Sequence, residues 1–148
     1  MTNEFDEFVK KLQNRIIKKD IKDHSKKIVE LFYSPQNWGK PLLEEITVYE
    51  ESQDEQNGDF LGIYLKIENN IIVKANFITD GCGVVIAIAS QLTIMITRKS
   101  IDYAIKLKPD NLIKALKGIP PDEIHYVNLV LMTLKNAIKK YNYNKQFC

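Results

Sequence analysis

The sequence has few cysteines, with only Cys82 and Cys148 among its 148 residues. Two thiols so far apart argue against a fold that is held together by disulfides. A signal-peptide pattern is also missing, because residues 1–6 are polar and acidic rather than basic and then apolar. We therefore expect a cytoplasmic protein without structural disulfides.

Long hydrophobic runs and an excess of one charge are lacking as well. The longest apolar stretch, residues 84–96, is interrupted by Ser90, Gln91 and Thr93 and is too short to cross a bilayer. Basic residues number 21 against 19 acidic ones, a net charge of +2. Nucleic acid and membranes are therefore not expected as principal partners.

The length of the chain is enough for one compact domain with its own core and too small for two. We expect a single domain over residues 1–148. Apolar residues at helical spacing predict an amphipathic N-terminal extension over about residues 1–22, which packs on its own domain or binds a partner. Residues 143–148 are expected to form a flexible tail.

Acidic residues are concentrated between Lys40 and Lys66, where no basic residue occurs. Solvated surface is the favoured interpretation, and a basic partner is the second. The seven residues are Glu44, Glu45, Glu50, Glu51, Asp54, Glu55 and Asp59.

Hydrophobic periodicity predicts strands in the middle of the chain. A helix over residues 23–33 ends at the turn-forming stretch SPQNWG, and strands follow over residues 46–49, 61–68 and 71–79. In the third strand, Ile71, Val73, Ala75 and Phe77 are expected on one buried face. Asn69-Asn70 suits a tight hairpin between the second and third strands.

The second half of the chain is expected to be helical. Residues 84–99 are apolar nearly all round, which predicts a helix through the centre of the domain. Ser100 can cap a short helix, Pro109 begins another that stops at Gly118, and Pro121 begins the last. The fold class is therefore α+β, with a three-stranded antiparallel meander packed against C-terminal helices.

Gly81-Cys82-Gly83 lies between a predicted strand and a predicted helix. Glycines beside the thiol let a metal or another backbone approach the sulfur, and the start of a helix favours the thiolate. The alternative is a small core residue, because unpaired cysteines are among the most buried residue types. The local sequence leaves both interpretations open.

Two further residues with metal-ligand chemistry lie at the ends of predicted elements. Asp59 precedes the second strand, and His125 lies in the first turn of the last helix. A meander packed against helices could bring both residues to the same end as Cys82, because functional groups are commonly held at such boundaries.

Four blocks of the sequence resemble the NifU/IscU-type iron-sulfur cluster assembly scaffolds, over about residues 24–141. SPQNWG resembles the family's N-P-R-N-x-G, and NGDFLGIYLKI resembles C-G-D followed by a strand. FITDGCGVVIAIASQLT resembles F-x-T-x-G-C-G-x-x-I-A-S-S-S-x-x-T, and GIPPDEIHYVNL resembles L-P-P-x-K-x-H-C-S-x-L. The four blocks occur in the family's order and at appropriate spacing.

The resemblance implies a scaffold, not an enzyme, that accepts sulfur from a cysteine desulfurase, assembles a [2Fe-2S] cluster and passes it to apo iron-sulfur proteins. The family's site uses three cysteines, an aspartate and a histidine. Asp59, Cys82 and His125 match three of these positions. The first cysteine falls on Asn57 and the third on Tyr126, so two of the three thiolates are absent.

One thiolate is a poor match for a cluster held by one chain. Cys148 or a second copy of the chain, paired through Cys82 as a homodimer, would supply another. Asp59, Cys82 and His125 form a mixed oxygen, sulfur and nitrogen set that suits a zinc or iron ion with a fourth position open. The family's chaperone-recognition segment also differs, because Glu123 replaces its lysine.

Three functional hypotheses remain. In the first, the chain is a divergent scaffold that binds a metal or a labile cluster, with Cys82 as sulfur acceptor. In the second, it is a cluster-free paralogue that interacts with the cysteine desulfurase machinery. In the third, it is a thiol hydrolase in which Cys82 is the nucleophile, His125 the base and Asp59 the residue that orients the base. The third lacks a recognisable nucleophile motif.

Overall fold

A computed structural model describes residues 24–56, 58–81 and 83–146. The expected N-terminal extension, Asn57, Cys82 and Cys148 lie outside the described residues. The fold is α+β, as the sequence predicts. Its elements are α2 (Lys26–Tyr33), β1 (Val48–Gln53), β2 (Phe60–Glu68), β3 (Ile71–Thr79), α3 (Gly83–Ile96), β4 (Lys99–Ser100), α4 (Ile101–Ile105), α5 (Pro109–Ala115) and α6 (Ile124–Gln146), with 3-10 turns at Leu43–Glu45 and Pro121–Glu123.

The sheet of the described chain is antiparallel, with the strand order β1-β2-β3-β4. The hairpin between β2 and β3 turns through Asn69 and Asn70, whose φ angles of 53° and 63° confirm the expected tight turn. The prediction of a three-stranded meander is incomplete, because β4 pairs with β3 as a fourth strand of the described sheet. The fourth strand arises because Arg98, with a φ of 69°, reverses the chain after α3 and donates its N–H to Ile72 at 2.6 Å.

A bulge changes the buried face of β3. Lys66 pairs with Lys74 but Ile67 pairs with Ile72, so Val73 is the extra residue on β3. The side chains that face the core therefore shift by one position at this point. The core face holds Ile72, Ala75 and Phe77, and the prediction of Ile71 and Val73 on this face is wrong for that reason.

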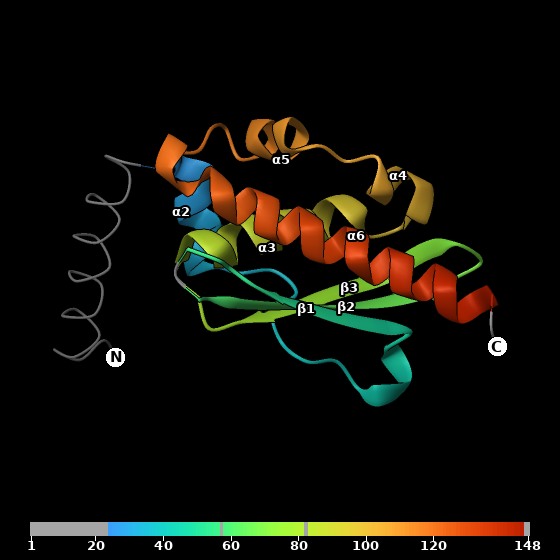
Figure 1. The fold of residues 1–148 in the computed structure, drawn as a ribbon. Coiled ribbons are helices and arrows are strands. Elements are labelled where there is room, and N and C mark those ends of the chain that lie inside the picture. Colours follow the sequence, from blue (N-terminus) through green and yellow to red (C-terminus); the bar gives the residue numbers. More distant parts are fainter. Residues whose placement is uncertain (1–23, 57, 82, 147–148) are drawn as a thin grey trace, which may run out of the picture.

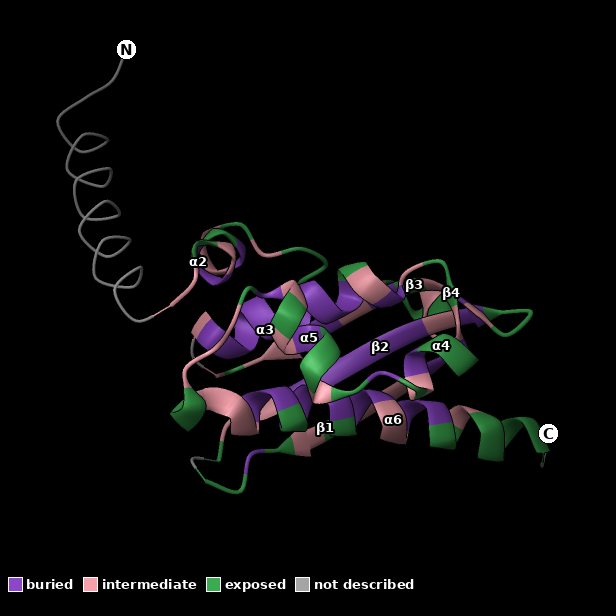
Figure 2. Cartoon of the chain, turned by 90° about the horizontal axis from the view of Figure 1, so that it is seen from above, coloured by how far each residue is buried: buried purple, intermediate pink, exposed green. Residues whose placement is uncertain are grey.

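Helices α3 and α6 lie on the same side of the sheet (Figure 1). Residues Val84–Thr93 of α3 are buried without interruption, so the prediction of a central helix is confirmed. Figure 2 shows the contrast with α6, in which buried and exposed residues alternate along the helix. The core therefore lies between one face of the sheet and these two helices.

The SPQNWG stretch is fastened to α3 and to β3. The backbone N–H of Gln36 donates to Ser90 Oγ at 3.1 Å, and the Asn37 side chain donates to Thr93 Oγ1 at 3.1 Å. Gly39 N–H donates to the carbonyl of Phe77 at 2.8 Å. Ser90 and Thr93, two of the polar side chains on a mainly apolar helix, thus hold this loop in place.

The C-terminal helices begin and end near the expected residues. Ser100 caps α4, Pro109 begins α5, and Gly118 adopts a φ of +101° after α5. The last helix continues to Gln146, so residues 143–146, which were expected in the tail, are helical. Among the described residues, no helix combines the length and the hydrophobicity needed to cross a membrane.

Candidate functional site

Three connections meet at one end of the fold. They are the loop between β1 and β2, the turn between β3 and α3, and the start of α6 (Figures 1 and 2). The first carries Asp59, the second carries Gly81 and Gly83, and the third carries His125. The element boundaries that were expected to converge do so.

Asp59 lies against Gly81, the residue before Cys82 in the sequence. A Cβ placed on Gly81 would be 3.3 Å from Asp59 Oδ2 and 3.2 Å from Thr79 Oγ1. The turn is also tied to the start of β2, because Thr79 Oγ1 donates to the carbonyl of Phe60 and Asp80 accepts the Phe60 N–H at 2.7 Å. The structure therefore brings Asp59 beside the segment that carries the cysteine.

Gly83 is required by a neighbouring side chain. A Cβ at this position would overlap the ring of Phe32, which belongs to α2. The expectation that the glycine serves the approach of a metal or backbone is thus incomplete, because at Gly83 the close neighbour is an aromatic ring. This glycine lets α2 pack directly on the first turn of α3.

His125 pairs with a residue that the sequence did not single out. Its Nδ1 lies 2.8 Å from Oδ2 of Asp54. The Asp54 side chain is only 5% exposed, so the prediction of a solvated acidic surface is wrong at this one residue. The hydrolase hypothesis gave the orienting role to Asp59, whereas the observed partner of His125 is Asp54.

Asp54 also organises the loop that leads to Asp59. Its backbone N–H donates to the carbonyl of Asp59 at 2.7 Å, and its own carbonyl accepts from Gly58 at 2.8 Å. Its Oδ1 accepts the N–H of Gln56 at 3.0 Å, which is an Asx turn. In the sequence, an aspartate that begins a turn with a glycine soon after it is only a weak sign of a functional residue. The contact with His125 is what distinguishes Asp54 from the other acidic residues.

Tyr126, at the position of the family's third cysteine, is buried and belongs to the hydrophobic core. Its ring also packs on that of His125, with centroids 4.0 Å apart. The side chain at this position therefore contributes to packing and to holding the imidazole.

Glu123, which replaces the family's lysine, pairs with His24. The Nε2 of His24 lies 2.6 Å from Oε2 of Glu123, and both side chains are largely buried. The pair joins the beginning of the described chain to the start of α6.

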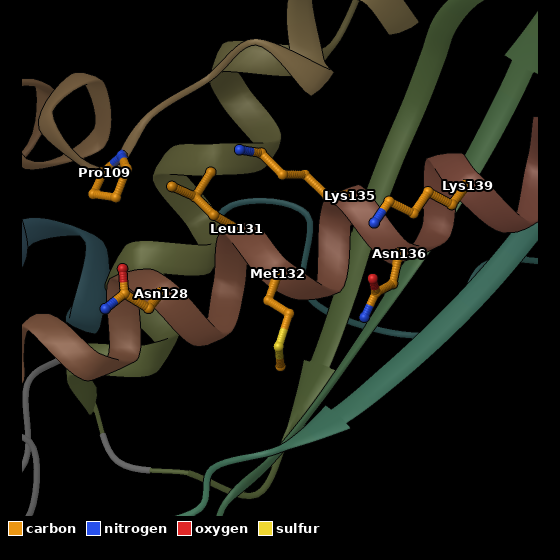
Figure 3. A pocket seen from close by; sticks show the side chains of 7 residues that line it. All are labelled: Pro109, Asn128, Leu131, Met132, Lys135, Asn136 and Lys139. Atoms are coloured by element: carbon orange, nitrogen blue, oxygen red, sulfur yellow. The ribbon is translucent and has the colours of Figure 1, made fainter.

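A shallow hollow of about 270 Å³ opens beside the pair of Asp54 and His125. Asn128 and Met132 line it and also line a second hollow of about 310 Å³ farther along α6, next to Lys135 and Lys139 (Figure 3). No group of three histidine, cysteine, aspartate or glutamate side chains that could hold a metal occurs among the described residues, which do not include Cys82.

The relatives that comparison with known proteins finds are named as IscU or NifU proteins. The chain is 36% identical over 121 residues to the iron-sulfur cluster assembly scaffold protein IscU of Aquifex aeolicus, covering 80% of this chain and 76% of that protein. It is 34% identical over 122 residues to the iron-sulfur cluster assembly protein IscU of Plasmodium falciparum, covering 82% and 75%. It matches the nitrogen fixation protein NifU of Azotobacter chroococcum at 31% identity, over 80% of this chain but only 38% of that longer protein.

Solved structures show the same fold at lower identity. A putative scaffold protein for the SUF system from Fervidobacterium islandicum aligns with a TM-score of 0.62 at 18% identity, covering 78% of this chain and 96% of that one. The N-terminal part of a NifU-like protein from Brucella abortus aligns with a TM-score of 0.63 at 14% identity, covering 86% and 98%. The family model described as the NifU-like N-terminal domain matches residues 23–148. The chain therefore belongs to the NifU-like N-terminal domain family.

Proposed function

We propose that this protein is an iron-sulfur cluster assembly scaffold with a reduced site, and not an enzyme. The matches to relatives named as iron-sulfur cluster assembly proteins, one of them a scaffold protein, cover most of the chain. The observation that carries the proposal is the position of Asp59 against Gly81, the residue before Cys82, at the end of the fold where α6 begins and carries His125 in its first turn. We propose a cytoplasmic protein whose partners are a cysteine desulfurase and apo iron-sulfur proteins.

The donor set decides which cargo fits. A carboxylate, a thiolate and an imidazole from Asp59, Cys82 and His125 suit a single zinc or iron ion, with one position left for water or another ligand. A cluster needs more thiolates than one chain offers at this site, because the third family position is a buried tyrosine. A [2Fe-2S] cluster would therefore be labile, or shared between two copies of the chain.

Cys82 is proposed as the sulfur acceptor. Its thiolate would attack the terminal sulfur of a persulfide carried by the desulfurase. The sulfur-sulfur bond of the donor breaks, a new one forms on Cys82, and the donor leaves as a thiolate. The transfer is an exchange between thiols and needs no added oxidant or reductant.

Metal analysis of anaerobically purified protein tests the proposal, with wild type beside Cys82→Ser. We expect iron or zinc in the wild type and its loss in the variant. Incubation with iron, a desulfurase and cysteine should then give charge-transfer absorption or a persulfide on Cys82. Absence of metal, absorption and persulfide together would refute the scaffold function.

The buried Tyr126 favours a second candidate, a cluster-free paralogue that binds the desulfurase machinery, because a core side chain has replaced a ligand. This candidate predicts that Cys82→Ser leaves the affinity for the desulfurase unchanged and that purified protein lacks stoichiometric metal. Stoichiometric metal that depends on Cys82 would exclude it.

A further inference from the structure

The pair of Asp54 and His125 is buried on one side and open on the other. The Asp54 side chain is 5% exposed and the His125 side chain is 20% exposed, and their 2.8 Å contact joins Oδ2 to Nδ1. The hollow beside them is lined by both residues. The imidazole is therefore fixed at one nitrogen by a carboxylate that has little contact with water.

Both oxygens of Asp54 are already engaged. Oδ2 faces His125, and Oδ1 accepts the backbone N–H of Gln56 at 3.0 Å. Both oxygens of Asp54 are thus bonded within the fold, one to the imidazole and one to the loop that leads to Asp59. An ionised carboxylate only accepts hydrogen bonds, so opposite an ionised Asp54 the Nδ1 of His125 is the donor, and in the neutral imidazole Nε2 then keeps its lone pair.

We propose that Asp54 is a positioning residue that selects Nε2 of His125 as the nitrogen available to a metal ion. Histidine ligands in metal sites commonly donate their other N–H to a carboxylate, which sets the tautomer and the orientation of the ring. This inference rests on the proposed function for its ligand, but the state of the imidazole can be measured without metal.

Asp54 also connects two parts of the site. Its backbone hydrogen-bonds with Asp59 and Gly58, and its side chain holds His125 on α6. The loop that carries Asp59 and the helix that carries His125 are thus joined through one residue. A side-chain change at Asp54 should alter the contact with His125 and leave the backbone hydrogen bonds to Asp59 and Gly58 in place, whereas a change at the neighbouring exposed Glu55 should affect neither.

The variant Asp54→Asn separates positioning from simple packing. An amide has the shape of the carboxylate but only one accepting oxygen. The N–H of Gln56 can only donate, so the amide oxygen stays with it and the amide NH2 faces His125. The imidazole must then accept at Nδ1, which moves its proton to Nε2 and blocks the lone pair that a metal would use. Asp54→Ala removes the partner and leaves a mixture of tautomers.

The test is nitrogen NMR of the histidine rings in the full chain, for wild type, Asp54→Asn, Asp54→Ala and the matched control Glu55→Gln. The chain has only two histidines, so His24→Gln assigns the signals of His125. We expect the Nδ1-protonated tautomer in wild type and in the control, and the Nε2-protonated tautomer in Asp54→Asn. An Nε2-protonated wild type, or the same tautomer in all four proteins, would overturn the proposal.

Zinc affinity, measured by competition with Zn²⁺ alone as the ligand, gives a second readout. Loss of an outer partner of a histidine ligand commonly weakens metal binding by about 10- to 100-fold, and we expect this loss in both Asp54 variants but not in Glu55→Gln. Unchanged affinity in both Asp54 variants would contradict the proposal. If wild type binds no zinc, the single-ion site of the proposed function fails, while the tautomers still decide the role of Asp54. Should Asp54→Ala not fold, the isosteric Asp54→Asn decides alone.

Discussion

Substituting Gly83 by alanine tests how α2 packs on the start of α3. The new methyl group would overlap two atoms of the Phe32 ring and lie 3.0 Å from a third, where carbon atoms normally approach to about 3.5–4.0 Å. The ring also packs edge-on against Tyr33, with centroids 4.7 Å apart and an interplanar angle of 86°, so moving it would disturb that contact as well. The substitution should therefore displace Phe32 or shift the two helices.

The expected cost follows from two opposing effects. Overpacking a well-filled interface typically costs about 1–3 kcal/mol. In the interior of a helix, alanine stabilises the helix by up to about 1 kcal/mol relative to glycine, and this gain is smaller at the first helical position. We therefore expect Gly83→Ala to lower the free energy of unfolding by about 1–2 kcal/mol, measured by urea denaturation with an unchanged m-value.

A double-mutant cycle with Phe32→Ala isolates the contact. Without the ring, Gly83→Ala should be neutral or slightly stabilising. Gly81→Ala is the matched control on the other side of Cys82, because its nearest neighbours would be 3.2–3.3 Å away and need move only slightly. Its cost should be below about 1 kcal/mol. Wild-type stability in Gly83→Ala, or an equal loss in the Phe32→Ala background, would refute this explanation of the glycine.

Three other predictions concern pH and capping. Burial, and then a 2.6 Å hydrogen bond to the Glu51 carboxylate, raise the pKa of Tyr49 above its usual range. Above about pH 10 only the unfolded chain then loses this proton, so the free energy of unfolding should fall as the pH rises past that point. Urea denaturation at a series of pH values should show a less steep fall in Tyr49→Phe. The Lys66 ammonium lowers the pKa of Glu45, so this pair stabilises the fold above the ordinary pKa of a glutamate. As the pH falls through the pKa of Glu45, the free energy of unfolding should decrease slightly, and this decrease should be absent in Lys66→Met. Ser100→Ala removes the cap of α4 and should cost about 1 kcal/mol in thermal or urea unfolding, whereas unchanged stability would mean that the cap contributes nothing.

The helices and strands could be predicted largely from local patterns. Apolar residues nearly all round residues 84–99 indicated a buried central helix, which ends at Ile96, and Asn69-Asn70 indicated a hairpin, because both depend on neighbours in the sequence. The buried face of β3 could not be predicted at Ile71 and Val73, on the N-terminal side of the bulge. Alternation is a local rule, and a bulge is set by pairing with another strand.

The candidate site divides in a similar way. Residue types and order alone pointed to Asp59 and His125, and four sequence blocks carried the family resemblance that the comparisons confirm. Asp54 was hidden among exposed acidic residues, since its partner lies 71 positions away on α6. Burial of a charge and the choice of its partner depend on which segments meet in space.

The sequence by itself determined the fold class, the family and the residue types at the end of the domain that carries the site. It did so because periodicity, turn residues and motif spacing are properties of neighbouring positions. Only the tertiary structure decided that Gly83 makes room for Phe32, that Tyr126 packs in the core, and that Asp54 holds His125. These features are contacts between distant segments, and their energies exist only once the chain has packed.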